Sequence, residues 1–538
     1  MRLQRPVSFL IAAALAVSLA ACSSTTASSS SAASGTVIAA ENTTYSLEGA
    51  TAFTFTDSGI TAVDGDYDGY KIEGTTLTIS TAGTYVVSGS CADGSIKIKA
   101  ETEGVVLALN GLDLTSTTTA PIVCGKSTGV TLVAQDGTEN TLTDTEANNK
   151  DSDAASEDAE NAVLKCKDGS QVTLCGTGTL NINAAGKNGI KSGTENDGRE
   201  AWLTIRELTL NLSAPVNDAI NAEQTLNVES GTLNISAGDD AVHCDYTLNI
   251  GAEGTAGPTI NISACCEGLE GATLNIYSGD INITASDDCL NAANGDLTDY
   301  DFSMNIYGGT INAYTSEGDG FDSNGTMDIT GGSITVWTAN TADNQPLDAD
   351  GTITITGGTV LAAGGSAGMS YTISAEQAYV TYGGGMGADS TVSLAEGSAF
   401  TIADADGSLL YSSTAVCNAN YIFYSSADLA ADSDYTLTCG GTALATSAAA
   451  TGTATTSFGP GMGGPGGDMN GMTPPDGTQA PSDGQTPPTM GNGQPGQMPS
   501  GQTGTPPEKP SGDASGTPPQ RPDNSSNDAT SQADTTAV

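Results

Sequence analysis

The sequence predicts an all-β fold: a right-handed parallel β-helix, which is a solenoid, with β caps at its ends and a disordered C-terminal tail. Three observations predict it. Short segments of alternating apolar and polar residues recur along the chain, glycine-containing turns separate them, and the repeat has a period of about 26 residues. A period of this length built from short strands is typical of solenoids, in which each turn of chain stacks on the previous one.

The charge and composition exclude several classes of partner. Among 538 residues, 63 Asp and Glu oppose only 15 Lys and Arg, which gives a formal net charge of −48. Because such a charge repels nucleic acid and anionic lipid, we expect no nucleic-acid partner and no membrane contact apart from a lipid anchor. Aromatic residues make up 5% of the chain and charged residues 14%, unlike an ordinary helical enzyme. We expect a monomer.

The N-terminus predicts export and anchoring. Residues 1–22 contain Arg2 and Arg5, then an apolar run that is short for a bilayer span, and end in Leu-Ala-Ala-Cys at Cys22. This arrangement resembles a bacterial lipobox, which implies cleavage before Cys22 and diacylation of its sulfur; a plain secretory signal is the alternative. Residues 23–44, rich in Ser, Thr and Ala, predict a flexible tether. The expected location is the extracellular face of the bacterial cell membrane.

The β-helix is predicted over residues 45–368. Each repeat there holds two alternating strands, and the period of two along a strand turns every second residue inward. The inward positions of the first strand include Leu226, Leu248, Leu274, Met304, Met327 and Ile353. Those of the second strand are Leu180, Leu210, Leu233, Ile260, Ile281, Ile311, Ile334 and Val360.

Asparagines recur at the outward positions between these apolar residues. Stacked amides hydrogen-bond along the axis in cross-β ladders, so we expect these rows to be structural. They are Asn227, Asn249, Asn275 and Asn305 on the first strand and Asn211, Asn234, Asn261, Asn282 and Asn312 on the second.

Acidic residues flank a third apolar anchor in each repeat. Stacked turns lie only about 4.8 Å apart, so equivalent carboxylates repel one another and need a counter-ion. Calcium fits best because it accepts about six to eight oxygen ligands in loose geometry, whereas zinc favours Cys and His, and His243 is the only histidine. Solvated acidic turns without an ion are the alternative. The expected ligands are Asp218, Asp239, Asp240, Glu267, Glu270, Asp287, Asp288, Asp319, Asp322 and Asp348, in a column interrupted at Asn188, Asn221 and Pro346.

Several segments carry a family resemblance. They are GTYVVSGSCADGSIKI from Gly83, VVLALNGLDLTS from Val105, DGTENTLTDTE from Asp136, GTGTLNINAAGKNGIKSG from Gly176, and the repeats that follow. The chain resembles, over roughly residues 45–364, the carbohydrate-binding β-helix family of bacterial cell-surface proteins, which occurs in clostridia and is similar in fold to pectate lyases. The resemblance implies calcium at the turns and binding, without cleavage, of plant cell-wall polysaccharide, either acidic and pectin-like or cellulosic.

Two kinds of contact with such a polysaccharide are expected. An ion held by two or three protein carboxylates keeps coordination positions for a uronate, so calcium would bridge a polyanionic protein to a polyanionic glycan. Aromatic rings stacked on an outward face would supply a platform for sugar rings; incidental surface rings, or packing beneath the C-terminal segment, are the alternative. The rings are Tyr277 and Tyr307 on first strands and Tyr314 and Trp337 on second strands.

Two other functions stay open: a calcium-dependent, pectate-lyase-like enzyme and a structural adhesin or wall spacer. A lyase needs a base beside the uronate, and the candidates are Lys187, Lys191 and His243. Surrounding acids raise the pKa of a lysine, which favours salt bridges to the next turn of chain over a role as base. We therefore assign no catalytic residue.

The cysteines and the C-terminal part complete the predictions. Cys124, Cys166 and Cys244 each follow an anchor by two residues and are expected to be buried and free, whereas Cys417 and Cys439 are candidates for a bridge. Residues 369–451 keep an alternating pattern and predict a C-terminal β region or cap. Residues 452–538, rich in Gly, Pro, Gln and Thr, predict a disordered tail.

Overall fold

The computed structural model describes residues 47, 49–63, 69–339, 344–365, 370–383 and 392–457. The signal segment 1–22 with its lipidation site Cys22, the tether 23–44 and residues 458–538 of the tail lie outside the described residues. Within the described residues the chain is all-β, with one 34-stranded sheet, one four-stranded sheet and a single turn of 3-10 helix, η1 (Glu146–Asn148). No helix in this part of the chain is long and apolar enough to cross a membrane.

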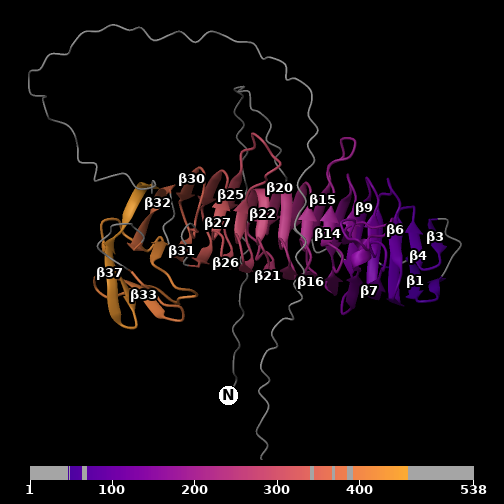
Figure 1. Cartoon of the computed structure of the whole chain (residues 1–538), viewed down its shortest axis with the longest axis horizontal. Helices are drawn as coiled ribbons and strands as arrows, with labels where there is room; N and C mark the ends of the chain where they lie inside the picture. The colour runs from indigo at the N-terminus through magenta and orange to yellow at the C-terminus, as the bar shows by residue number, and fades with distance from the viewer. Residues whose placement is uncertain are drawn as a thin grey trace, which may run out of the picture. The chain divides into compact units, whose positions relative to one another are not determined.

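Three rows of parallel strands make up most of the large sheet, and Figure 1 shows their strands following one another in chain order. Row 1 contains β9 (Gly129–Ala134), β12 (Gln171–Cys175), β15 (Trp202–Ile205), β18 (Thr225–Val228), the second halves of β20 (Val242–Ile250) and β22 (Leu269–Ile276), β25 (Ser303–Ile306), β28 (Thr326–Ile329), β30 (Thr352–Ile355) and β32 (Ser370–Gly383).

Rows 2 and 3 are built in the same way. Row 2 contains β10 (Glu139–Thr143), β13 (Thr179–Asn183), β16 (Thr209–Ala214), β19 (Thr232–Ala237), β21 (Thr259–Ala264), β23 (Asp280–Ala285), β26 (Thr310–Thr315), β29 (Ser333–Thr338) and β31 (Thr359–Gly364). Row 3 contains β6 (Ser95–Ile98), β8 (Ile122–Cys124), β11 (Ala162–Cys166), β14 (Asn188–Ser192), β17 (Ile220–Ala222), the first halves of β20 and β22, β24 (Leu290–Ala292) and β27 (Phe321–Ser323).

Further strands flank the rows at both ends, some of them parallel and some antiparallel to their neighbours. At the N-terminal end, β1 (Thr51–Thr56), β5 (Gly83–Cys91) and β7 (Val105–Thr115) pair in parallel, β2 (Gly59–Val63) is antiparallel to β1, and β3 (Tyr70–Glu73) is antiparallel to β4 (Thr76–Ile79). At the C-terminal end, β35 (Tyr421–Ser425) and β38 (Ala450–Ser457) are antiparallel to β32. The four-stranded sheet has the order β34 (Leu409–Thr414), β33 (Ala399–Asp404), β36 (Asp434–Cys439) and β37 (Thr442–Ala448).

The register within the rows is the one expected from the alternation of apolar residues. The eight second-strand positions from Leu180 to Val360 pair in sequence in row 2, and the first-strand positions from Leu226 to Ile353 pair in row 1. These side chains are almost completely buried. Burying each Leu or Ile contributes about 1.5–3 kcal/mol, and a slip by one residue would expose a whole row, so the apolar pattern fixes the register.

Two asparagine ladders run along the outer faces of the rows. In row 2, each Asn Nδ2 donates to Oδ1 of the Asn on the preceding strand at 2.8 to 3.2 Å, from Asn312 back to Asn181. In row 1, Asn305, Asn275 and Asn249 donate in the same way, ending at Asn227, at 2.9 to 3.0 Å. The side chains therefore link consecutive strands along the axis, which is the structural role expected of them.

The C-terminal strands enclose a second hydrophobic core, separate from the core of the rows. Trp337 and Leu361 of row 2 contribute to it together with Phe400 of the four-stranded sheet. The predicted bridge between Cys417 and Cys439 is wrong, because all ten described cysteines are free: Cys417 Sγ instead donates to the Thr338 carbonyl at 3.2 Å. Cys124, Cys166 and Cys244 are buried and free, as expected.

Candidate functional site

Row 3 arranges the acidic residues in two columns. The anchors from Ile190 to Leu347 pair in the expected order, so the residues around them stack as well. Two positions before the anchors lies the turn column: Asn188, Asp218, Asp240, Glu267, Asp288, Asp319 and Gln345. One position after them lies the strand column: Lys191, Asn221, His243, Glu270, Asn291, Asp322 and Asp348.

One member of the turn column differs from the sequence prediction. Gln345 lies opposite Asp319, because Phe321 pairs with Leu347, and the Gln345 N–H donates to Asp319 Oδ1. Pro346, which was expected there, lies one position further along the chain. The column thus ends on a side-chain amide, which carries a side-chain oxygen that proline lacks.

The charge of the strand column reverses along the axis. Lys165 and Lys191 pair in row 3 at its N-terminal end, His243 follows, and the C-terminal end carries only acids and amides. The sequence contains no Lys or Arg between Arg206 and Lys509. Within this stretch, which is evident from the sequence, the acids of the columns have no neighbouring Lys or Arg in the sequence to neutralise them.

At the N-terminal end, protein groups neutralise the acids. Lys191 Nζ lies 2.9 Å from Glu223 Oε1 and donates to Asn221 Oδ1 at 2.8 Å, and Asn221 Nδ2 donates to Asp218 Oδ2 at 2.6 Å. Lys187 Nζ lies 2.5 Å from Asp151 Oδ2. Burial still raises the pKa of Asp218 to about 6. Both lysines are therefore held in salt bridges, the role that the sequence favoured over that of a base.

His243 takes the place of a cation in the middle of the column. Its Nδ1 lies 3.4 Å from Asp240 Oδ2 and also contacts Glu270, while its Nε2 lies 3.0 Å from Asp245 Oδ1. Burial lowers the pKa of His243, but hydrogen bonds to these three carboxylates outweigh burial and hold the pKa well above its usual range. An imidazolium here already neutralises Asp240 and Glu270.

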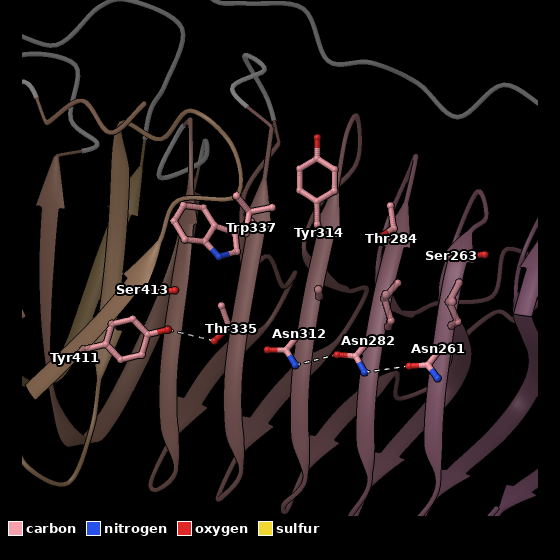
Figure 2. A pocket seen from close by; sticks show the side chains of 14 residues that line it. Asn261, Ser263, Asn282, Thr284, Asn312, Tyr314, Thr335, Trp337, Tyr411 and Ser413 are labelled. Atoms are coloured by element: carbon pink, nitrogen blue, oxygen red, sulfur yellow. Dashed lines mark hydrogen bonds between the residues drawn. The ribbon is translucent and has the colours of Figure 1, made fainter. Parts of the chain in front are cut away.

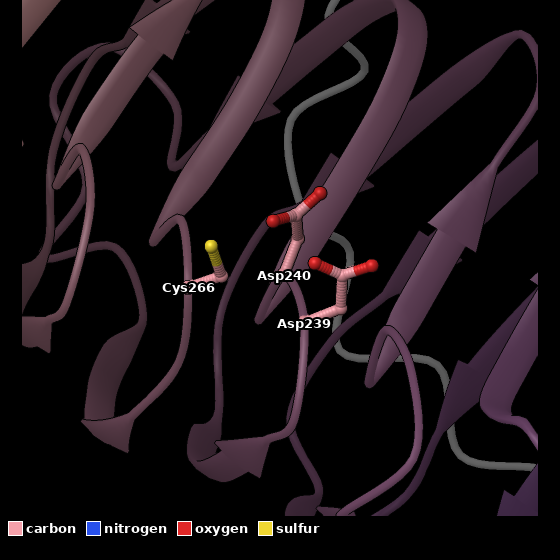
Figure 3. Close-up of side chains that lie close together, drawn as sticks. All are labelled: Asp239, Asp240 and Cys266. Atoms are coloured by element: carbon pink, nitrogen blue, oxygen red, sulfur yellow. The ribbon is translucent and has the colours of Figure 1, made fainter. Parts of the chain in front are cut away.

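A second group combines two expected ligands, Asp239 and Asp240, with the thiol of Cys266, which was not expected there. The ligand atoms of Asp239, Asp240 and Cys266 all lie within 4.8 Å of one another, on neighbouring turns (Figure 3). Burial, followed by the nearby carboxylates, raises the pKa of the Cys266 thiol to about 11, so the sulfur is protonated at neutral pH. A neutral thiol is a poor ligand for a hard cation, which makes this group a weak calcium site.

The third group consists only of oxygen donors. Carboxylate oxygens of Asp319, Asp322 and Asp348 lie within 4.8 Å of one another. Burial, then repulsion between these carboxylates, raises the pKa of Asp319 to about 7 and of Asp322 to about 6. The side-chain amide of Gln345 hydrogen-bonds to Asp348, and its Oε1 is buried with no hydrogen-bond donor among the described residues. Three acids and an unpaired amide oxygen suit a divalent cation.

The remaining expected ligands lie between the second and third groups. Burial raises the pKa of Glu267 to about 7 and of Asp288 to about 8. Asn291 Nδ2 donates to Glu267 at 2.8 Å, while Asn291 Oδ1 is buried with no donor among the described residues. Asp287 is exposed on the turn. Within the described part of the chain, these side chains and Asp218 do not join a group of three ligands.

The aromatic residues divide into two different settings. The rings of Tyr277 and Tyr307 stack with centroids 4.9 Å apart and planes at 10°, and Tyr307 is 46% exposed. Trp337 is only 1% exposed, because it packs edge-on against Phe400 of the four-stranded sheet. Of the two alternatives left open by the sequence, packing beneath the C-terminal segment is therefore the one that holds for Trp337, and the exposed platform is wrong for this residue.

A groove of about 510 Å³ lies over row 2, where the C-terminal strands meet it (Figure 2). Asn261, Asn282 and Asn312 of the row 2 ladder line it, and Tyr411 and Ser413 of β34 close one end. The sequence analysis missed this groove. The asparagines were interpreted as structural, so they were not considered as ligand contacts. The alternation of side chains along β34 does not indicate that this strand would lie against row 2.

A family model described as "Carbohydrate-binding domain-containing protein" matches residues 73–362 and 250–450. The chain belongs to this family. The match confirms the carbohydrate-binding family resemblance and extends it beyond residue 364 into the C-terminal strands. A "Carbohydrate-binding domain-containing protein" of Acetivibrio thermocellus is 34% identical over 131 residues, which are 24% of this chain and 44% of that relative. The part of the relative that this chain matches is therefore less than half of the relative's length.

Among solved structures, the chain is similar to one titled "Structure of the polysaccharide lyase-like protein from C. thermocellum, Gadolinium derivative". The identity is 21%, the similarity covers 61% of this chain and 94% of that chain, and the TM-score is 0.29.

Proposed function

We propose that this protein is a non-catalytic, calcium-dependent polysaccharide-binding protein, displayed at the outer face of a bacterial membrane by lipid on Cys22. Membership of a carbohydrate-binding family supports the ligand class. The observation that carries the calcium dependence is the cluster of Asp319, Asp322 and Asp348, which we call the triad. Its oxygens lie within 4.8 Å of one another in a stretch of sequence without Lys or Arg.

The fold proposed for the rows is a right-handed parallel β-helix. Each repeat passes through row 1, row 2 and row 3 in turn, and each strand pairs in parallel with its counterpart in the next repeat, as β13 does with β16 and β16 with β19. Such a path places equivalent turns on top of one another. It accounts for acids that gather in columns although they are spread over more than a hundred residues of sequence.

The triad fits calcium better than the two other groups of neighbouring ligand atoms do. One of these contains His243 and the other contains Cys266. Asp319, Asp322 and Asp348 would hold the ion, and the buried Gln345 Oε1 offers a fourth oxygen. Calcium accepts about six to eight oxygen ligands, so several positions would stay open. When bound, the ion supplies positive charge and open coordination positions for the carboxylate of a uronate residue. The protein's part is to hold the three carboxylates together against their repulsion.

A lyase function is the second candidate, and Lys165 is the observation that favours it. Burial lowers the pKa of Lys165, and the neighbouring Lys191 lowers it further, as a catalytic base requires. Lys165 lies on β11, however, six strand spacings along row 3 from β27, which is about 29 Å. A base must lie within hydrogen-bond reach of the proton it removes, so Lys165 and the triad do not form one active site.

The test is retention of the full-length protein on immobilised polygalacturonate, with calcium and with EGTA. We expect retention in calcium and loss in EGTA. The double variant Asp322→Asn and Asp348→Asn should lose retention in calcium at least tenfold, whereas Asp328→Asn should not. Asp328 makes a suitable control because it lies on β28 in row 1, in the same repeat.

Three results would overturn parts of the proposal. Equal retention in calcium and EGTA would remove the calcium dependence, and the absence of retention on polygalacturonate and on every polysaccharide of a glycan array would leave a structural adhesin. Release of unsaturated uronides, detected by their ultraviolet absorbance, would show that the protein is a lyase. In that case Lys165→Met should abolish the release.

A further inference from the structure

We propose that the groove over row 2 is a second glycan site, which binds a neutral oligosaccharide chain without calcium. The inference rests on the proposed function to the extent that the ligand is a carbohydrate. The groove lies on row 2, whereas the triad lies on row 3, so the two sites use different faces of the repeats. Its volume of about 510 Å³ is in the range of sites for small ligands.

The floor of the groove offers regularly spaced amides. Asn312 Nδ2 donates to Asn282 at 3.0 Å, and Asn282 Nδ2 donates to Asn261 at 3.2 Å. Each side-chain amide has two N–H donors and two lone pairs, and the ladder uses one of each, so Asn261 and Asn312 keep a donor and an acceptor for a ligand. Asn282 keeps only an acceptor, because its Nδ2 also donates to Asp280 at 3.4 Å. The steps repeat at the strand spacing of about 4.8 Å, close to the length of one pyranose residue in an extended glycan.

A second line of side chains lies beside the amides. Figure 2 shows Ser263, Thr284, Tyr314 and Trp337 on successive strands, parallel to the line of Asn261, Asn282 and Asn312. The two hydroxyls lie at the open end and the two aromatic rings at the end closed by β34. With amides along one side and the half-buried ring of Tyr314 toward its closed end, the groove offers the hydrogen bonds and the apolar contact that a sugar needs, whereas the ring of Trp337 is buried beneath the C-terminal strands.

The lining is uncharged, which selects the class of glycan. None of the described residues that line the groove is charged, although the chain carries a net charge of −48. A uronate would meet a negative protein here with no Lys or Arg in the surrounding sequence and no group of acids in the groove to hold a bridging ion. The favoured ligand is therefore a neutral glycan.

A buried donor at the closed end points to a bound group. Trp337 is 1% exposed, and its Nε1 has no acceptor among the described residues. Figure 2 shows this nitrogen on the ring edge turned toward Ser413 and Thr335, whose hydroxyl lies 3.4 Å from Tyr411 OH. An indole N–H left without a partner costs free energy, and a ligand hydroxyl at the end of the groove would satisfy it.

The experiment is titration of the full-length protein with cellopentaose in EGTA, followed by calorimetry and by tryptophan fluorescence. The chain has two tryptophans, so Trp202→Phe leaves Trp337 as the only reporter. We expect binding at one site with a change in Trp337 emission. Thr284→Trp, which fills the exposed rim, should weaken binding at least tenfold by calorimetry, the readout used for this variant and its control because each adds a tryptophan. Ser213→Trp is the matched control, because Ser213 is exposed one position after the buried Leu212 of β16, as Thr284 follows Ile283 of β23, outside the groove.

The outcomes separate this inference from the proposed function. Equal affinity of the Thr284→Trp and Ser213→Trp variants for cellopentaose would overturn the groove site, and so would a wild-type protein that binds polygalacturonate in calcium but does not bind cellopentaose. Loss of polygalacturonate retention in the Asp322→Asn and Asp348→Asn variant, with cellopentaose binding unchanged, would support two separate sites. A protein that binds neither cellopentaose, nor polygalacturonate, nor any polysaccharide of the glycan array would refute both proposals.

Discussion

The triad predicts that the calcium-free protein loses stability as the pH rises. Burial and neighbouring carboxylates raise the pKa of Asp319 from 3.8 to about 7 in the folded chain. The folded state therefore binds this proton more tightly than the unfolded state does. Between about pH 4 and pH 7 the unfolded carboxyl is ionised while the folded one still holds its proton, so the free energy of unfolding falls across this window and is constant above it.

The size of the effect follows from the pKa difference. A difference of about three pKa units is worth about 4 kcal/mol. Because Asp322 and Asp348 share the repulsion and side chains relax, we expect about half of this value, about 2 kcal/mol, from Asp319→Asn. In EGTA, Asp319→Asn should therefore raise the free energy of unfolding by about 2 kcal/mol at about pH 8 and leave it nearly unchanged at about pH 4.

Calcium should reverse the sign of this effect. If calcium binds the folded triad, a free concentration of about one hundred times the dissociation constant stabilises the wild type by about 2.7 kcal/mol, and the variant gains less. The assay is urea unfolding followed by far-ultraviolet circular dichroism, at both pH values, in calcium and in EGTA, with Asp328→Asn as control. An unfolding midpoint of the wild type in EGTA that does not fall with rising pH, or a variant less stable than the wild type at the higher pH in EGTA, would refute the reasoning.

Three further predictions test the packing of the rows. Asn261→Ala removes a donor and an acceptor from the middle of the row 2 ladder and should lower the free energy of unfolding in urea by about 1–2 kcal/mol; an unchanged midpoint would mean that the ladder contributes no stability. His243→Gln leaves three carboxylates without their cation and should lower the free energy of unfolding by about 3–5 kcal/mol in EGTA; an unchanged midpoint in urea would mean that the imidazolium does not stabilise these carboxylates. Gly325→Ala would place a Cβ against the carbonyl oxygen of Phe302 and should lower the melting temperature by several degrees, whereas Gly295→Ala, with open space around it, should not; equal melting temperatures would count against this packing.

Much of the strand arrangement was predictable because the rows depend on local periodicity. Alternation of apolar and polar residues sets the face of each side chain, and the constant spacing of anchors sets which residues stack, so the pairing of Leu180 with Leu210 could be deduced by counting. The asparagine ladders follow from the same periodicity. The residues of the acid columns were predictable for the same reason, apart from the shift between Pro346 and Gln345.

The acids that come together could not be identified in this way. Turns of different length carry Asp239, Asp287 and Asp319, and the direction in which each carboxylate leaves its turn is not encoded in the repeat. The pattern therefore gave ten equivalent candidates, of which the structure gathers Asp319, Asp322 and Asp348 into an all-oxygen group. It also surrounds His243 with three carboxylates, a contact that requires the side chains of two turns.

By itself, the sequence determined the all-β character, the stacking register and the position of the acidic columns, because these depend on spacings that repeat along the chain. Only the tertiary structure decided that the C-terminal strands pack over row 2, bury Trp337 and bring Tyr411 beside Thr335. That contact joins residues 76 positions apart. It depends on which apolar faces remain uncovered once the repeats have stacked, and this is a property of the assembled surface, which no periodicity in the chain specifies.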